Sequence, residues 1–297
     1  MKILAGIEMM RPVNGFMGWL TVVIGYLNTR DATDAFSVPG HVFWFGIIYI
    51  FIVGAGMIIN DIYDCRIDQV NRPDRPIPRG DVSLGEAKIL FGIVLGLGLL
   101  LAFYHGVATD MVVVNMTFTA TFGLGGWLYA AYGKKSGFAG NILVSLSFTM
   151  GLIYGALING LHVPGYIVYF FLTSFFLLMA REIIKGCEDV EGDRIESVNT
   201  LAILMGTRKS ALIAACFSCL AMVFFVLPVF APIINPGGFF LVMIPGVAVV
   251  GYASLLAIKP GLQKKDFTHI SRLQKAGAYL GLVAILVASF DWSGIFR

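Results

Sequence analysis

Residues 41–68 read HVFWFGIIYIFIVGAGMIINDIYDCRID. Residues 41–59 contain no Asp, Glu, Lys or Arg, and a helix of this length can cross the hydrocarbon core of a bilayer. Asp61, Asp64 and Asp68 follow where that helix would leave the lipid. Ionisable side chains beside lipid are costly and usually serve function. The stretch therefore predicts a membrane helix whose end carries a functional site.

The composition of the whole chain extends this interpretation. Its 297 residues are 58% hydrophobic with a mean hydropathy of +0.83, which is more apolar surface than a soluble core can bury. The apolar segments are too long and too evenly apolar for barrel strands, so helices are the remaining structure that satisfies the backbone in lipid. We predict an all-α polytopic membrane protein, a bundle of nine transmembrane helices at residues 13–29, 41–63, 84–105, 111–131, 139–160, 164–186, 208–230, 238–258 and 274–291.

The basic residues predict an orientation for these nine helices. Nineteen of the 21 Lys and Arg residues fall on the side of the N-terminus, and the other side keeps only Arg30 and Arg297. Because basic loops stay in the cytoplasm, we expect a multi-pass protein of the cell membrane with a cytoplasmic N-terminus. The net charge of +3 is then a signal of topology, and we expect no nucleic-acid partner.

A second acidic cluster occurs later in the chain, where residues 182–193 read EIIKGCEDVEGD. It also ends an apolar segment, and both clusters lie on the side predicted to be cytoplasmic. The recurrence suggests an internal repeat. We predict one intramembrane domain, residues 1–297, built from two pseudo-repeated four-helix units plus one helix.

The spacing of the acids favours a metal site over a solvated helix end. On a regular helix Asn60, Asp61, Asp64 and Asp68 fall within an arc of about 100°. Asp189 and Asp193 fall within about 40° of Glu182 if that helix continues. A charged helix end in water explains one such acid but not two clusters that each gather on one face. Oxygen-rich faces of this kind bind Mg²⁺, which in turn can hold a diphosphate.

Basic and polar groups accompany the clusters. Residues 71–80 read NRPDRPIPRG, a loop that prolines keep from becoming a helix and that holds three arginines. Arginine forms fork-like hydrogen bonds to phosphate oxygens. We expect these arginines to form a basic lining around the acids, together with Arg11, Asn14, Lys134 and Lys135. The residues expected to bind substrate are Asn60, Arg11, Asn14, Arg72, Tyr132, Lys135 and Lys185.

The pattern Asn60-Asp61-x-x-Asp64-x-x-x-Asp68 resembles the first signature of the UbiA superfamily of intramembrane prenyltransferases. Asp189-x-x-x-Asp193 resembles the second, and the resemblance covers essentially the whole chain. Within the superfamily the chain looks most like the branch that makes archaeal ether lipids. It departs from that branch at Gly186, where an Asp is usual.

The resemblance implies a Mg²⁺-dependent prenyl transfer. A geranylgeranyl group would pass from its diphosphate to the hydroxyl of geranylgeranylglyceryl phosphate, a lipid-like acceptor, and form an ether bond. The implied catalytic acids are Asp64, Asp68, Asp189 and Asp193. The implied Mg²⁺ ligands are these four with Asn60 and Asp61.

Three alternative functions compete with this prediction. A transporter would place its polar groups near the middle of the bilayer, whereas these lie at helix ends. A membrane CDP-alcohol phosphotransferase would carry an Asp-Gly motif followed by Ala-Arg, which has no match here. An aromatic acceptor, as in quinone or haem synthesis, would use the same donor chemistry and stays open.

Overall fold

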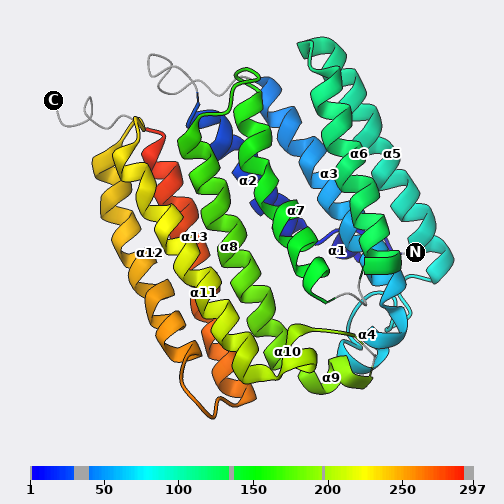
Figure 1. Ribbon diagram of the computed structural model, residues 1–297. Coiled ribbons are helices and arrows are strands. Elements are labelled where there is room, and N and C mark those ends of the chain that lie inside the picture. The colour runs from blue at the N-terminus through cyan, green and yellow to red at the C-terminus, as the bar shows by residue number, and fades with distance from the viewer. Residues whose placement is uncertain (1, 30–39, 134–136, 196–197, 291–297) are drawn as a thin grey trace. The chain divides into compact units, whose positions relative to one another are not determined.

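The computed structural model describes residues 2–29, 40–133, 137–195 and 198–290 (Figure 1). Within these ranges the side chains of residues 41, 67, 70, 71, 132, 133 and 195 lie outside the description. The elements of the described chain are helices, and it contains no strand, which confirms the all-α prediction. The chain divides into two compact units. One comprises Met1–Val23 and Val38–Lys134, and the other Ile24–Ser37 and Lys135–Arg297.

The first unit is built around three long helices that pack against one another in pairs, α3, α5 and α6. Its elements are α1 (Ile3–Met9), α2 (Pro12–Leu27, whose last four residues belong to the second unit), α3 (Gly40–Tyr63), α4 (Cys65–Asn71), α5 (Leu84–Thr109), α6 (Val112–Leu128) and the π-helical turn η1 (Tyr129–Gly133).

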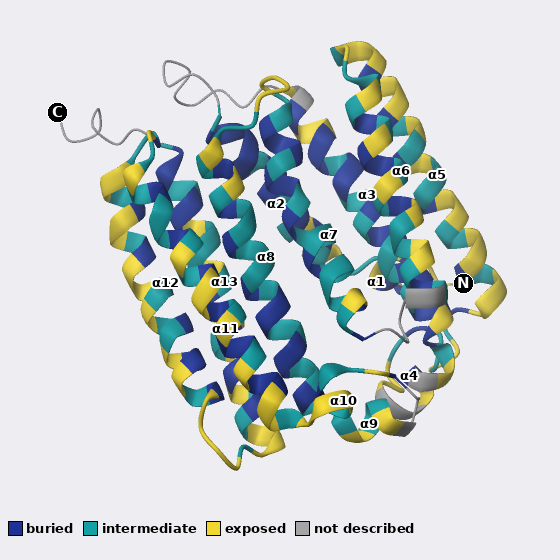
Figure 2. Ribbon diagram, viewed as in Figure 1, coloured by how far each residue is buried: buried dark blue, intermediate teal, exposed yellow. Residues whose placement is uncertain are grey.

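Helix α5 shows how the sequence separates lipid from core. It begins with a capping box, in which Ser83 Oγ accepts from the Glu86 amide and the Glu86 carboxylate accepts from the Ser83 amide. One face is exposed and apolar, as expected of a surface in lipid (Figure 2). That face presents Ile89, Ile93, Leu97, Leu100, Tyr104 and Val107. The opposite face buries small side chains, and Gly98 lies against Ile52 of α3.

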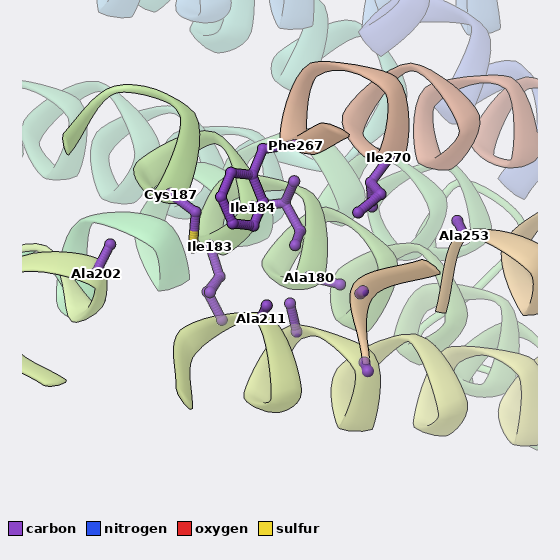
Figure 3. Packing of buried hydrophobic residues seen from close by; sticks show 12 residues of the cluster. Ala180, Ile183, Ile184, Cys187, Ala202, Ala211, Ala253, Phe267 and Ile270 are labelled. Carbon is purple, nitrogen blue, oxygen red and sulfur yellow. The ribbon is translucent and has the colours of Figure 1, made fainter. Parts of the chain in front are cut away.

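The second unit contains the remaining elements. They are α7 (Phe138–Leu157), α8 (Gly165–Glu188), α9 (Val190–Ile195), α10 (Leu201–Met205), α11 (Thr207–Val226), the 3₁₀ turn η3 (Leu227–Phe230), α12 (Pro236–Ala257) and α13 (Lys264–Ala288). The end of α8 packs with α10 to α13 around a buried cluster (Figure 3). Alanines supply seven of its twelve buried residues, and such small side chains let helices approach closely in lipid. Ile183, Ile184 and Phe267 fill the space between the helices.

Seven helices in the described chain are long and apolar enough to cross a membrane. They are α3, α5, α7, α8, α11, α12 and α13, and each overlaps a predicted span. The other two predicted spans coincide with α2 and α6, which have 16 and 17 residues and are shorter than the roughly 20 residues that a perpendicular crossing needs. The count of nine spans therefore stays a prediction, as do the single domain and the internal repeat.

Candidate functional site

The first acidic motif spans a junction between two helices. Helix α3 ends at Tyr63, Asp64 has φ −86° and ψ 0°, and α4 begins at Cys65. The Asp64 amide donates to the Asn60 carbonyl at 2.9 Å, and the Asp68 amide donates to the Asp64 carbonyl at 2.8 Å. Because these i to i+4 bonds continue across the junction, Asn60, Asp64 and Asp68 keep helical spacing along one side.

The acids of this motif are buried and held by arginines. Asp61 and Asp68 are each 4% exposed. Arg75 Nη1 donates both to Asp61 Oδ1, at 3.1 Å, and to Asp68 Oδ2. Arg11 Nη2 donates to the same Asp61 Oδ1 at 2.6 Å. Buried carboxylates require such partners, so two arginines from different segments are part of the motif.

Arg11 lies in an unusual backbone conformation between α1 and α2. Its φ of 49° is in the left-handed region, which a residue with a side chain adopts at a cost of roughly 1–2 kcal/mol. Its guanidinium contacts Met57 Sδ in addition to Asp61, and the Asn14 amide group lies 3.9 Å from that sulfur. Burial lowers the pKa of Arg11, while the Asp61 carboxylate opposes that shift. The ion pair thus offsets the cost of burial.

The loop after α4 turns Arg75 toward the acids. The Pro76 carbonyl accepts from the amides of Asp81 and Val82, at 3.0 and 3.1 Å, which closes the loop on itself. Pro76 is buried, and the Arg75 side chain is only 16% exposed. Arg72, which the sequence suggested as a phosphate ligand, is exposed. The sequence singled out the three-arginine loop but not which arginine faces the motif.

Asp64 is the remaining acid of the first motif. It is 6% exposed, and Asn60 Nδ2 donates to its Oδ2 at 3.0 Å. Amide and carboxylate oxygens are the hard donors that Mg²⁺ prefers, so the chemistry of this set fits that ion. In the described part of the chain, however, no three His, Cys, Asp or Glu side chains form a group that could hold a metal. In the first motif a guanidinium lies against Asp61 and Asp68 instead.

The second motif repeats the junction and differs in its surroundings. Helix α8 ends at Glu188, Asp189 has φ −101° and ψ 11°, and α9 follows. The Asp193 amide donates to the Asp189 carbonyl at 3.0 Å. The Asp189 amide likewise donates to the Lys185 carbonyl at 2.9 Å, so i to i+4 bonds continue across this junction as in the first motif, and Asp189 and Asp193 keep helical spacing. Asp189 is exposed and Asp193 half-buried.

Charged groups of α8 precede the second motif. Glu182 pairs with Arg181 at 3.1 Å and with Lys185 at 3.4 Å, one turn further along the helix. Glu188 Oε1 accepts from Thr268 Oγ1 of α13 at 2.8 Å, which ties the end of α8 to the last helix. Lys185 thus pairs with Glu182 of its own helix. Arg181 pairs with the same carboxylate, which the sequence did not predict.

Two predicted phosphate ligands fall at the edge of the description. Lys135 lies outside the described residues. Tyr132 belongs to the π-helical turn that ends α6, and its side chain is outside the description.

A model of the UbiA prenyltransferase family matches residues 18–272. The digeranylgeranylglyceryl phosphate synthase of Methanothermobacter thermautotrophicus is 33% identical over 287 residues, which cover 95% of each chain. The synthase of the same name from Korarchaeum cryptofilum is 30% identical over 289 residues, covering 97% of this chain and 98% of the other.

Solved structures give the same result. A structure described as digeranylgeranylglyceryl phosphate synthase in membranes aligns with a TM-score of 0.75 and 27% identity, covering 97% of this chain and 98% of its own. A UbiA homologue from Archaeoglobus fulgidus, bound to GPP and Mg²⁺, aligns with a TM-score of 0.64 over 95% of this chain and 99% of its own. At 17% identity the second likeness supports the fold alone.

Proposed function

Because the chain belongs to the UbiA prenyltransferase family, we propose that it transfers a geranylgeranyl group from its diphosphate to the hydroxyl of geranylgeranylglyceryl phosphate. The observation that carries this proposal is similarity along nearly the whole chain to enzymes named digeranylgeranylglyceryl phosphate synthase. The product would be an ether lipid with two prenyl chains. The protein is a multi-pass membrane protein, a setting in which both substrates can enter from the lipid.

We propose that oxygen ligands of each motif hold Mg²⁺. A UbiA homologue was solved with GPP and Mg²⁺, which is the donor chemistry that this assignment requires. Bound Mg²⁺ would neutralise charge on the leaving diphosphate. The ligands would be Asn60, Asp64, Asp68, Asp189 and Asp193. Asp61 belongs to the same motif, but its described partners are two arginines.

The remaining proposed site residues bind and orient the substrates. Arginine and lysine side chains would hold the diphosphate oxygens as the bond between C1 of the prenyl group and oxygen breaks. The residues proposed for this role are Arg11, Asn14, Arg72, Tyr132, Lys135 and Lys185. The acceptor hydroxyl would then attack C1 and release its proton. Apolar helices that exclude water would protect the cationic centre from hydrolysis.

The sidedness of the protein is a separate proposal. We propose that the N-terminus and both motifs face the cytoplasm, because 19 of the 21 basic residues lie on that side of the nine-helix topology. A membrane-impermeant thiol reagent on intact cells would test it. With Cys65 as the only cysteine, labelling only after the cells are opened is the expected result. Labelling of intact cells would contradict the orientation.

The decisive experiment combines purified protein with geranylgeranyl diphosphate, geranylgeranylglyceryl phosphate and Mg²⁺. Mass spectrometry should detect the doubly prenylated product, and EDTA should abolish it. A parallel reaction replaces the lipid acceptor by hydroxybenzoate. Prenylation of hydroxybenzoate alone would contradict the ether-lipid acceptor and retain the donor chemistry. No prenyl transfer to either acceptor would contradict the proposal as a whole.

A further inference from the structure

Arg75 lies against two carboxylates that a metal cation could also bind. Its Nη1 donates to Asp61 Oδ1 and to Asp68 Oδ2, so one nitrogen bridges two buried carboxylates of the same motif. Arg11 makes a second, 2.6 Å contact with the Asp61 oxygen. The two arginines therefore divide their contacts unequally: Asp61 is held by both, and Asp68 by Arg75.

Because of this unequal division, we expect Asp61 and Asp68 to differ in how readily they bind a divalent cation. A divalent ion bound to Asp61 Oδ1 would meet two guanidinium groups at contact distance, and like charges repel strongly where water is excluded. A divalent ion bound to Asp68 would compete with one described direct contact, that with Arg75. Mg²⁺ binds carboxylate oxygens at about 2.1 Å, which brings it close to any guanidinium on the same carboxylate. Metal and Arg75 are therefore competitors for Asp68.

We propose that Arg75 is a positioning residue that competes with Mg²⁺ for Asp68, while Asp61 keeps its guanidinium at the site. The inference rests on the proposed Mg²⁺-dependent function. When the metal takes Asp68, Arg75 retains its contact with Asp61 and gains a free donor for a phosphate oxygen. Asp61 then holds the Arg75 guanidinium in place and affects the diphosphate only through that guanidinium. Arg75 in turn links metal binding to the binding of the diphosphate.

The loop geometry supports this exchange. The turn closed by the Pro76 carbonyl fixes the backbone next to Arg75, so the guanidinium can change partner without movement of the loop. Ile77 packs on the buried cluster of the first unit, which holds the loop in place from the other side of Pro76. The long arginine side chain supplies the remaining freedom.

The test measures binding of Mn²⁺, a paramagnetic substitute for Mg²⁺, to the purified full-length protein in detergent without prenyl diphosphate. Electron paramagnetic resonance reports the free Mn²⁺. Arg75→Gln should bind Mn²⁺ about tenfold more tightly, the equivalent of one charge-assisted hydrogen bond removed from the competition. Arg75→Lys, which keeps the charge and loses the fork, should show a smaller gain. Unchanged or weaker binding in both variants would overturn the proposal.

Arg79→Gln is the matched control. Arg79 belongs to the same loop and its loss changes the net charge equally, but its partners are Glu8 and Asp81. Its affinity for Mn²⁺ should stay within about twofold of the parent, because exposed charges at a distance are screened by salt. An equal gain in Arg79→Gln would assign the effect to net charge and overturn the role of Arg75.

Two further variants separate this inference from the proposed function. Asp64→Asn should bind Mn²⁺ weakly, since Asp64 is a proposed ligand whose described hydrogen-bond partner is Asn60. If Asp64→Asn binds as tightly as the parent, the metal assignment itself fails. Should Arg75→Gln not fold, Arg75→Lys decides the matter. Parental Mn²⁺ affinity in a folded Arg75→Lys protein would overturn the competition.

Discussion

The two acidic motifs share a backbone design and differ in what surrounds their carboxylates. In both, a long helix ends one residue before an aspartate, and a short helix continues with an i to i+4 bond across the junction. In the first motif three aspartates are at most 6% exposed, and two of them are bound by arginines. In the second motif Asp189 is exposed and Asp193 half-buried.

The difference distinguishes two roles of an acidic side chain, namely its role in catalysis and its role in the stability of the fold. Buried carboxylates paired with guanidinium groups are part of the folded framework, and removal of one partner leaves an uncompensated charge. An exposed carboxylate can be removed at little cost to folding. We therefore expect the motifs to respond alike in activity and differently in stability.

The largest expected effect is on turnover. Asp64→Ala and Asp189→Ala should each reduce turnover at least about a thousandfold, or ~4 kcal/mol, because each removes a proposed metal ligand. Product formation with saturating substrates measures the loss, and circular dichroism in detergent checks that each variant is folded. Glu191→Ala, an exposed acid of α9 outside the motif pattern, is the control and should remain active. Full activity in either aspartate variant would break the proposed likeness of the motifs.

The second effect is on stability and should distinguish the motifs. Asp61→Ala leaves the Arg11 and Arg75 guanidinium groups without their shared carboxylate, and should lower the free energy of unfolding by about 3 kcal/mol. Glu182→Ala breaks the half-buried pairs with Arg181 and Lys185 and should cost about 1 kcal/mol or less.

Denaturant titration of both variants in the same detergent gives the comparison. Asp61→Asn, which retains an acceptor oxygen, should lie between Asp61→Ala and the parent. Equal losses in Asp61→Ala and Glu182→Ala would show that burial does not separate the two charge clusters.

Much of the helical framework follows from the sequence, because long apolar runs have few alternatives in lipid. The span predicted at 84–105 corresponds to α5, which runs from Leu84 to Thr109. Hydropathy predicts the last span at 274–291, whereas α13 begins at Lys264. Its first turns carry Lys264, Lys265 and Asp266, so hydropathy located only the apolar part. Hydropathy does not locate the end of a helix that continues from the lipid into water.

The site was less accessible to sequence reasoning. The two signatures identify the acids, but the helix breaks at Asp64 and Asp189 have no glycine or proline to mark them. Arg72 and Arg75 both precede a proline, but Arg72 caps the end of α4, whereas Arg75 lies next to the turn closed at Pro76 and contacts the acids. Choosing between them requires the loop's own hydrogen bonds, which depend on its three-dimensional path.

A third prediction concerns the loop beside the first motif. Arg72→Ala should raise the Michaelis constant for the prenyl donor about tenfold, through loss of a charge-assisted hydrogen bond to phosphate. It should leave the unfolding midpoint unchanged because Arg72 is exposed. Arg66→Ala removes another exposed arginine, on α4, and is the control for charge. An unchanged Michaelis constant in Arg72→Ala would remove its proposed contact.

The smallest expected effect tests how the second motif is supported. Gly186 lies inside α8, and a Cβ at this position would lie 3.6 Å from Thr200 Cβ, an ordinary contact. Gly186→Ala should therefore raise the free energy of unfolding by about 0.5 kcal/mol, because alanine loses less backbone freedom than glycine in a helix. Thermal unfolding measures the shift, and activity should be retained.

Gly186→Asp sharpens the same test, since it introduces the acid that the resemblance to the ether-lipid branch implies at this position. Its side chain is longer and its charge lies one residue after Lys185, so a gain in stability is expected to be smaller than for alanine. If Gly186→Ala destabilises the protein, then Thr200 does not leave the 3.6 Å that a Cβ at position 186 would have to its own Cβ. The second motif would then be as tightly packed as the first. If Gly186→Ala stabilises the protein and Gly186→Asp retains activity, the second motif has room for another acid at position 186.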